Sequence, residues 1–397
     1  MCVFSLLKSL VYALPLMLLA EMMHSAEVLA APGVVNNDID WEFSGAMLSV
    51  PRSSIAATSV GHLALFAGGK LQNGTLTDVV DIFDRKTNKW TTARLSAARS
   101  EIGAGSVAGR YALFAGGLDD SFKPMTLVDV YDAMTGHWSQ IRLGTARAAP
   151  RMLDLGDLTA IVGGLSGDLQ YLSNAVDYVD AKLGISSAAL EGRYPQLGVA
   201  VSDPVGGVGL YTSGYENIQP GQRFNDFQAA NRTTVFTAQG TAVGFDGGAQ
   251  FPFPRWGASG AAANGVFAVG GGHVFGSGSE ELTTTSDRVD VYHTTTGKWS
   301  STALKMSVAR DYPLAQAVGD YVVFVSGTQQ SKDFDILDTR TSRFVNMSEH
   351  RPALHTLRSD AAAATVDGCL LVIAGGSVYG GRNKTASVEI FDACSGF

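Results

Sequence analysis

The sequence predicts an all-β fold made of seven four-stranded antiparallel sheets, and three observations support this prediction. A cassette consisting of an apolar strand ending in Gly-Gly, an aspartate-bearing strand and a tryptophan recurs about every 48 residues. Its internal spacing is constant, because 22 residues separate Gly68 from Trp90 and also Gly116 from Trp138. No segment after the N-terminal apolar run has a useful helical period. Self-similarity at such a period is typical of folds in which each unit packs on its neighbours.

Two copies of the cassette are clear, and five more can be aligned with them. The clear copies carry LALFAGG (63–69) and YALFAGG (111–117). The corresponding strands of the later copies are TAIVGG (159–164), VGLYTSG (208–214), VFAVGGG (266–272), VVFVSG (322–327) and LLVIAGG (370–376). In the third copy Ile185 stands where the tryptophan is expected. Each copy holds four strand-sized pieces between turn residues, which indicates a seven-bladed β-propeller with four-stranded antiparallel blades.

The two ends of the repeat array complement each other. The seventh copy ends after VEIFD (388–392) and lacks its tryptophan strand. The segment DWEFSGAML (40–48) precedes the first copy and matches KWTTARLSA (89–97) in position and type. We therefore expect this N-terminal strand to close the last blade, since closure removes exposed sheet edges. The predicted propeller occupies residues 40–397, after an N-terminal linker at 31–39.

The Gly-Gly pair, the downstream Tyr-Asp or Phe-Asp and the tryptophan together resemble the kelch motif. The resemblance covers residues 40–397. It implies a propeller but no single activity, because the family includes extracellular, cytoplasmic and enzymatic members. Glycine pairs allow close approach of backbones, and tryptophan buries a large face between sheets. We therefore interpret the motif residues as structural.

The N-terminus resembles an export signal, which we place at residues 1–30. Lys8 is the only charge before the apolar run Leu10–Ala20, and Val28-Leu29-Ala30 suits a signal peptidase. The alternative is a retained anchor helix. No later segment is long enough to span a membrane. The predicted location is secreted or extracellular, or periplasmic for a bacterial source. The net charge of −8 and the absence of a basic stripe argue against nucleic acid as a partner.

Two cysteines remain after removal of the signal, and an export signal favours their oxidation. Cys369 opens one strand of the last copy, and Cys394 closes the next strand. A disulfide between them would stabilise the fold by roughly 3 kcal/mol, because it restricts the unfolded chain. Two separate buried thiols are the alternative. Candidate glycosylation sites are Asn73, Asn231, Asn346 and Asn383.

The predicted binding face follows from the strand order. With strands A to D counted from the centre, the B–C and D–A links share one face, and long loops on a rigid scaffold concentrate binding residues. Each copy places an arginine just before strand A: Arg52, Arg99, Arg151, Arg193, Arg255, Arg310 and Arg358. One hypothesis is an arginine-lined channel mouth that holds an anionic ligand. The alternative is structural pairing with acidic residues that recur in the repeats: Asp81, Asp129, Asp177, Asp290 and Glu389.

The long B–C links add candidate ligand contacts: Tyr215, Phe224, His273 and Tyr379. Aromatic side chains beside arginines would suit a partner. Alternatively, these side chains fold back onto their own loops.

The sequence carries no motif that identifies an active site. HExxH, GxSxG and a phosphate-binding loop are all missing. We therefore assign no catalytic residue, metal or cofactor. The expected function is a binding module for an extracellular protein or carbohydrate, acting through the B–C and D–A face. The alternative is a secreted sugar-modifying enzyme, mutarotase- or epimerase-like, with an arginine-lined site at the channel mouth. A purely structural extracellular module is a third possibility.

Overall fold

The computed structural model describes residues 42–167, 171–189, 196–216, 228–229, 231–240, 242–244, 250–274, 284–327, 331–346, 352–378 and 381–394. The chain divides into the units Met1–Val34 and Val35–Phe397, and every described residue belongs to the second. The predicted signal at 1–30 and the linker at 31–39 lie outside the described residues. The described part of the chain contains no helix long and apolar enough to cross a membrane.

The described residues fold into antiparallel sheets of mainly four strands, without an α-helix. The first three sheets in chain order are β3(Ala56–Val60)–β4(Leu63–Ala67)–β6(Val79–Asp84)–β7(Lys89–Arg94), β8(Gly103–Val107)–β9(Tyr111–Ala115)–β10(Met125–Asp132)–β11(Trp138–Arg147) and β12(Arg151–Asp154)–β13(Leu158–Val162)–β16(Ala175–Asp180)–β17(Ile185–Ala189). Two sheets with a fifth strand follow: β18(Gln196–Asp203)–β19(Val208–Glu216)–β21(Thr233–Thr237)–β22(Ala242–Gly244), where β20(Gln228–Ala229) joins β19, and β24(Ser259–Ala263)–β25(Val266–Gly270)–β28(Arg288–His293)–β29(Lys298–Trp299), where β30(Leu304–Lys305) joins β28. The remaining two are β31(Leu314–Val318)–β32(Tyr321–Val325)–β33(Asp335–Asp338)–β34(Arg343–Phe344) and β35(Ala362–Val366)–β36(Leu370–Ala374)–β39(Ser387–Asp392)–β1(Glu42–Met47).

Short two- or three-stranded ribbons are formed by segments that precede or link the strands of single sheets. They are β2(Arg52–Ser53) with β5(Lys70–Leu71), β14(Leu165–Ser166) with β15(Tyr171–Leu172), β26(His273–Val274) with β23(Arg255–Trp256) and β27(Thr284–Thr285), and β37(Ser377–Val378) with β38(Asn383–Lys384).

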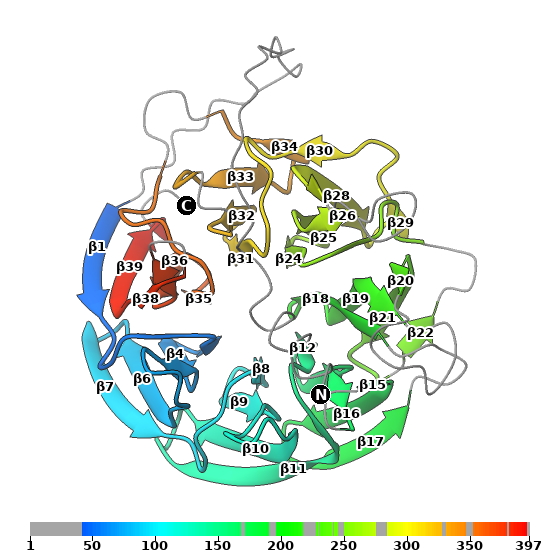
Figure 1. Cartoon of the computed structure of the whole chain (residues 1–397). Helices are drawn as coiled ribbons and strands as arrows, with labels where there is room; N and C mark the ends of the chain where they lie inside the picture. Colours follow the sequence, from blue (N-terminus) through cyan, green and yellow to red (C-terminus); the bar gives the residue numbers. More distant parts are fainter. Residues whose placement is uncertain are drawn as a thin grey trace, which may run out of the picture. The chain divides into compact units, whose positions relative to one another are not determined.

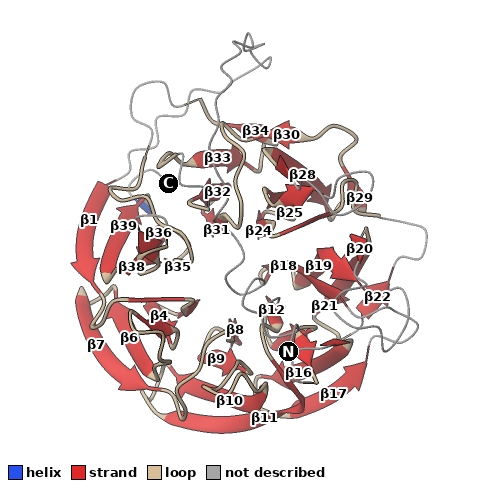
Figure 2. Cartoon of the chain, viewed as in Figure 1, coloured by secondary structure: helices blue, strands red, loops and turns tan. Residues whose placement is uncertain are grey.

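Within the second unit the sheets follow one another around a common centre, with the first strand of each sheet innermost (Figure 1). Strands account for nearly all of its regular structure (Figure 2). The innermost strands of successive sheets contact one another from β3 through β8, β12, β18, β24, β31 and β35, and β35 also contacts β3. This arrangement is consistent with a propeller-like fold.

The Gly-Gly pairs turn the chain at the ends of the second strands. In the first sheet the five residues of β4 are all buried, and Gly68 and Gly69 follow with φ of +63° and +104°. A Cβ atom on Gly69 would lie 2.4 Å from the carbonyl oxygen of Ser53, so only glycine fits there. Trp90 packs on Phe83 with 5.1 Å between ring centroids, which fills the space between neighbouring sheets.

The N-terminal strand pairs with the last strand, as predicted, but in a different register. β1 runs antiparallel to β39, with Glu42 opposite Asp392 and Phe43 opposite Phe391. Phe43 therefore takes the position that Trp90 has opposite Phe83. The proposed match of residues 40–48 with 89–97 is wrong by two residues. The new register places Leu48 at the position equivalent to Leu95, and both side chains are buried, so burial of this leucine explains the shift.

The predicted disulfide between Cys369 and Cys394 is confirmed, with Cα atoms 5.0 Å apart. The guanidinium of Arg85, at the end of β6, donates to Cys394 Sγ at 2.7 Å and pairs with Asp367 at 3.1 Å. The first and last sheets are thereby joined beside the disulfide. A disulfide at this place is compatible with an extracellular protein.

Candidate ligand-binding site

Five of the predicted mouth arginines are completely buried: Arg52, Arg99, Arg255, Arg310 and Arg358. Each pairs with an acidic residue of its own repeat, and those partners are Asp81, Asp129, Asp290, Asp335 and Glu389. The hypothesis that these five contact a ligand is therefore wrong, since their side chains have no exposed surface. The structural alternative holds for them.

Arg52 shows what the buried arginines do. Its guanidinium lies 2.7 Å from Asp81 on β6, and it donates to the carbonyls of Gly68 at 3.1 Å and Phe66 at 3.0 Å. Burial lowers the pKa of Arg52, while the charge of Asp81 and its hydrogen bond act in the opposite direction. The side chain thus ties the segment before the first strand to the second and third strands of the same sheet.

The third sheet corrects the predicted register of the series. Arg147 is completely buried there and pairs with Asp177, whereas the sequence alignment predicts Arg151 at this position. Arg147 lies 48 residues after Arg99, and 30 residues separate each of these arginines from its aspartate. The period of the cassette was therefore the signal that distinguishes Arg147 from Arg151.

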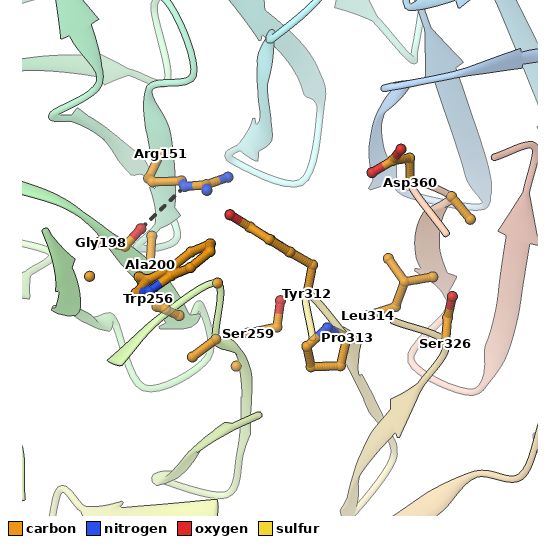
Figure 3. Close-up of a pocket in the computed structure, with 16 residues that line it drawn as sticks. Arg151, Gly198, Ala200, Trp256, Ser259, Tyr312, Pro313, Leu314, Ser326 and Asp360 are labelled. Carbon is orange, nitrogen blue, oxygen red and sulfur yellow. Dashed lines mark hydrogen bonds between the residues drawn. The ribbon is translucent and has the colours of Figure 1, made fainter. Parts of the chain in front are cut away.

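Arg151 is the predicted mouth arginine that reaches a cavity. Its side chain is exposed and donates from Nε to the carbonyl oxygen of Gly198 at 3.2 Å. Among the described residues no carboxylate forms an ion pair with it. Figure 3 shows its guanidinium directed into the cavity, toward the hydroxyl of Tyr312. Arg151 is consequently positioned to bind an anionic group.

The cavity has a volume of about 340 Å³ and lies where several innermost strands begin. Its charged and aromatic wall is formed by Arg151, Trp256, Tyr312 and Asp360. Figure 3 places Arg151 and Asp360 on different sides of the space, with Tyr312 between them. Pro313, Leu314 and several glycines supply apolar and backbone surface. A concave site with few convergent polar groups is the usual form of a small-ligand site.

Tyr312 enters the cavity from a position with a left-handed backbone conformation. Its φ is +44°, a left-handed value that is strained for a bulky residue. Its N–H donates to the carbonyl of Gly257 at 3.0 Å, and its ring lies edge-on to Trp256 at 5.7 Å between centroids. The side chain is nevertheless 52% exposed. The exposed ring therefore gives the cavity an aromatic surface that a ligand can contact.

His273 lies behind the cavity wall and not in it. The imidazole is 7% exposed and stacks on Trp256 at 4.4 Å between ring centroids. Its Nε2 lies 2.6 Å from Asp311 Oδ1. The prediction that His273 contacts a ligand is therefore corrected, because the indole of Trp256 covers it. His273 instead supports Trp256 and links it to the segment that carries Tyr312.

Asp360 is exposed at the cavity wall but has protein around most of its carboxyl group. The resulting desolvation raises the pKa of Asp360, while the charges of Lys384 and Lys70 act to lower it. Burial and the charge of Lys70 lower the pKa of Lys384, and Asp360 acts to raise it. This side of the cavity therefore has an acidic group that binds a proton more readily than an ordinary aspartate.

Other predicted site residues fall where the structure gives no side-chain geometry. Arg193, Phe224 and Tyr379 lie outside the described residues. Tyr215 belongs to β19, but its side chain also lies outside them. Of the glycosylation candidates, Asn73, Asn346 and Asn383 are exposed and Asn231 is half-buried; their modification stays a prediction.

The sequence reasoning missed Trp256, Tyr312 and Asp360. The signal for all three was their place one or two residues after an aligned arginine, in RWG, RDY and RSD. Within the described ranges no group of three or more His, Cys, Asp or Glu side chains could hold a metal ion. The models of known protein families give no match to this chain, and neither do the curated proteins.

Proposed function

We propose that this chain is a secreted, seven-bladed propeller of the kelch type, and that it binds an extracellular ligand at the centre of its B–C and D–A face. The contact of β35 with β3 and the pairing of β1 with β39 support a closed ring. The disulfide and the N-terminal sequence support export. The bound partner is a protein or a carbohydrate that carries an anionic group.

The observation that carries this proposal is the exposure of one arginine side chain. The other mouth arginines in the described part of the chain form buried ion pairs, whereas Arg151 is exposed in the cavity. Its planar guanidinium offers paired donors to a carboxylate, sulfate or phosphate. Trp256 and Tyr312 provide aromatic surface beside it, the combination found at the anchor points of many interfaces.

The test is a binding measurement on the purified full chain with acidic sugars, neutral sugars and acidic peptides, using isothermal titration calorimetry. Arg151→Ala should weaken binding of anionic probes at least tenfold, as expected when a charge-assisted hydrogen bond is lost. Arg142→Ala is the matched control, because Arg142 is exposed on β11 and donates to Thr126 at 3.2 Å. Binding that is equally strong in both variants would contradict the proposal.

A second candidate function is a sugar-modifying enzyme at the same cavity. Asp360 favours it, because desolvation raises its pKa toward the range in which a carboxyl group can exchange a proton with a substrate. Tyr312 would be a second proton-transfer group across the space. The test is the rate of anomeric exchange of a sugar probe, followed by nuclear magnetic resonance. Acceleration by the wild-type chain that Asp360→Asn removes would support an enzyme, and no acceleration would exclude this reaction.

A further inference from the structure

A repeated backbone position surrounds the centre of the second unit, two residues after each buried arginine. It has a left-handed φ between +44° and +67° at Ser54, Glu101, Ala149, Gly257, Tyr312 and Asp360. These six residues are called the mouth positions below. Their conformation is strained for most side chains, so the repeat imposes it irrespective of the residue present.

Hydrogen bonds between neighbouring sheets link the mouth positions. Ser54 N–H donates to the carbonyl of Asp360 at 3.3 Å, and Ala149 N–H donates to that of Glu101 at 2.7 Å. Tyr312 N–H donates to the carbonyl of Gly257 at 3.0 Å. Equivalent residues of successive repeats are therefore adjacent and lie at the same level around the centre.

The side chains at the mouth positions differ although their backbones agree. The arginine two residues earlier is the same in each case, because packing requires it, whereas the mouth position carries Ser, Glu, Ala, Gly, Tyr or Asp. Gly257, Tyr312 and Asp360 line the cavity, and the other three do not. Variation on a constant backbone is what a set of ligand-selecting positions requires.

The tyrosine at one position depends on the glycine at the next. A Cβ atom on Gly257 would lie 3.1 Å from the Tyr312 ring, closer than an ordinary contact. The glycine therefore makes room for the aromatic ring to stand in the cavity. Neighbouring mouth positions thus act together to shape the wall.

We infer that the mouth positions Tyr312 and Asp360 select the ligand. They do so by forming hydrogen bonds with hydroxyl groups of a carbohydrate whose anionic group binds Arg151. This inference rests on the proposed function. Both side chains face the space that Arg151 enters (Figure 3). The Tyr312 hydroxyl can donate or accept, and the Asp360 carboxylate accepts from a sugar hydroxyl. A peptide rich in carboxylates would instead place negative charge against Asp360, which disfavours it.

The experiment titrates the full chain with D-glucuronate, with cyclohexanecarboxylate, which lacks the hydroxyls, and with hexaglutamate. The wild-type chain should bind glucuronate more tightly than either of the others. Tyr312→Phe and Asp360→Asn should each weaken glucuronate binding about three- to tenfold, as for the loss of one hydrogen bond. Neither should weaken cyclohexanecarboxylate binding. Thermal melting checks that each variant is folded.

Ala149→Ser is the matched control, because Ala149 has the same left-handed conformation at a mouth position outside the cavity. It should change none of the affinities. If Tyr312→Phe and Asp360→Asn leave the preference for glucuronate intact while Arg151→Ala removes binding, the selection inference is wrong and the proposed function stands. Tighter binding of hexaglutamate than of glucuronate also overturns the inference. No binding of any probe by the wild-type chain would contradict the proposed function itself.

Discussion

Two arginines four residues apart, Arg147 and Arg151, have opposite surroundings. Arg147 is completely buried, pairs with Asp177 and donates to the carbonyls of Ile161, Gly163 and Ala175. Arg151 is exposed in the central cavity and donates to one backbone carbonyl. The same residue type therefore stabilises the fold at one position and is available to a ligand at the other. The difference comes from position in the repeat, because the buried site lies at the 48-residue period.

The largest effect in this comparison is expected from Arg147→Ala. Removing one partner of a buried ion pair leaves Asp177 uncompensated, which should lower the free energy of unfolding by about 3–5 kcal/mol. Urea denaturation followed by tryptophan fluorescence measures this change. A loss below about 1 kcal/mol would show that the buried arginines do not hold the sheets together.

Arg151→Ala should separate binding from stability. The side chain is exposed and donates a hydrogen bond to the carbonyl of Gly198, so the free energy of unfolding should change by no more than about 0.5 kcal/mol. Ligand affinity should fall at least tenfold, about 1.4 kcal/mol. The same denaturation measurement and a calorimetric titration check both values. Strong destabilisation would place Arg151 with the structural arginines.

Gly257→Ala should disturb the aromatic wall without breaking an ion pair. The φ of +67° and the 3.1 Å approach of a Cβ atom to the Tyr312 ring both oppose a side chain there. The left-handed conformation costs an alanine about 1 kcal/mol, and the ring must also move. Thermal melting should show the loss. Ala149 shows that an alanine can adopt this conformation at an equivalent position. Unchanged stability of Gly257→Ala would therefore mean that the Tyr312 ring moves aside without a cost in free energy.

The smallest effect is expected from Asp360→Asn, and it should depend on pH. The raised pKa means that the folded chain binds the proton of Asp360 more tightly than the unfolded chain does. The contribution of this group to stability is therefore greatest at low pH and is lost as the pH rises through its raised pKa.

Asparagine removes that charge, so the variant should melt at a higher temperature than the wild-type chain at pH 7. The difference should disappear toward pH 3. Melting curves across this range provide the measurement, and a variant less stable at pH 7 would give Asp360 a structural role.

Much of the fold could be predicted from local patterns. The Gly-Gly strands and the tryptophans recur at a constant period because every sheet packs on its neighbour in the same way. The disulfide followed from the ends of two adjacent strands. The register of β1 could not be read from composition, since Trp41 resembles Trp90 more than Phe43 does, and burial of Leu48 decided between them.

The candidate site was harder to predict because its residues do not repeat. Arginine at a similar position in each copy suggested one common role, but burial divides those side chains into two groups. Arg151 lies at the start of the third sheet and Tyr312 just before the sixth, so they are far apart in sequence. They line one cavity only because the innermost strands surround one centre. The sequence predicts His273 as a loop residue that contacts a ligand, whereas in the structure Trp256 stacks on it and it is buried.

The sequence by itself determined the repeating strands, the packing residues at their ends and the pairing of the two cysteines, because these depend on neighbours within one repeat or between adjacent strands. Only the tertiary structure decided which arginine is buried, which aromatic ring is exposed and which side chains share the cavity. Those properties depend on contacts between separate sheets, and the spacing of residues within one repeat does not predict such contacts. The 48-residue cassette therefore identifies the scaffold, and the departures from it at Arg151, Tyr312 and Asp360 identify the candidate site.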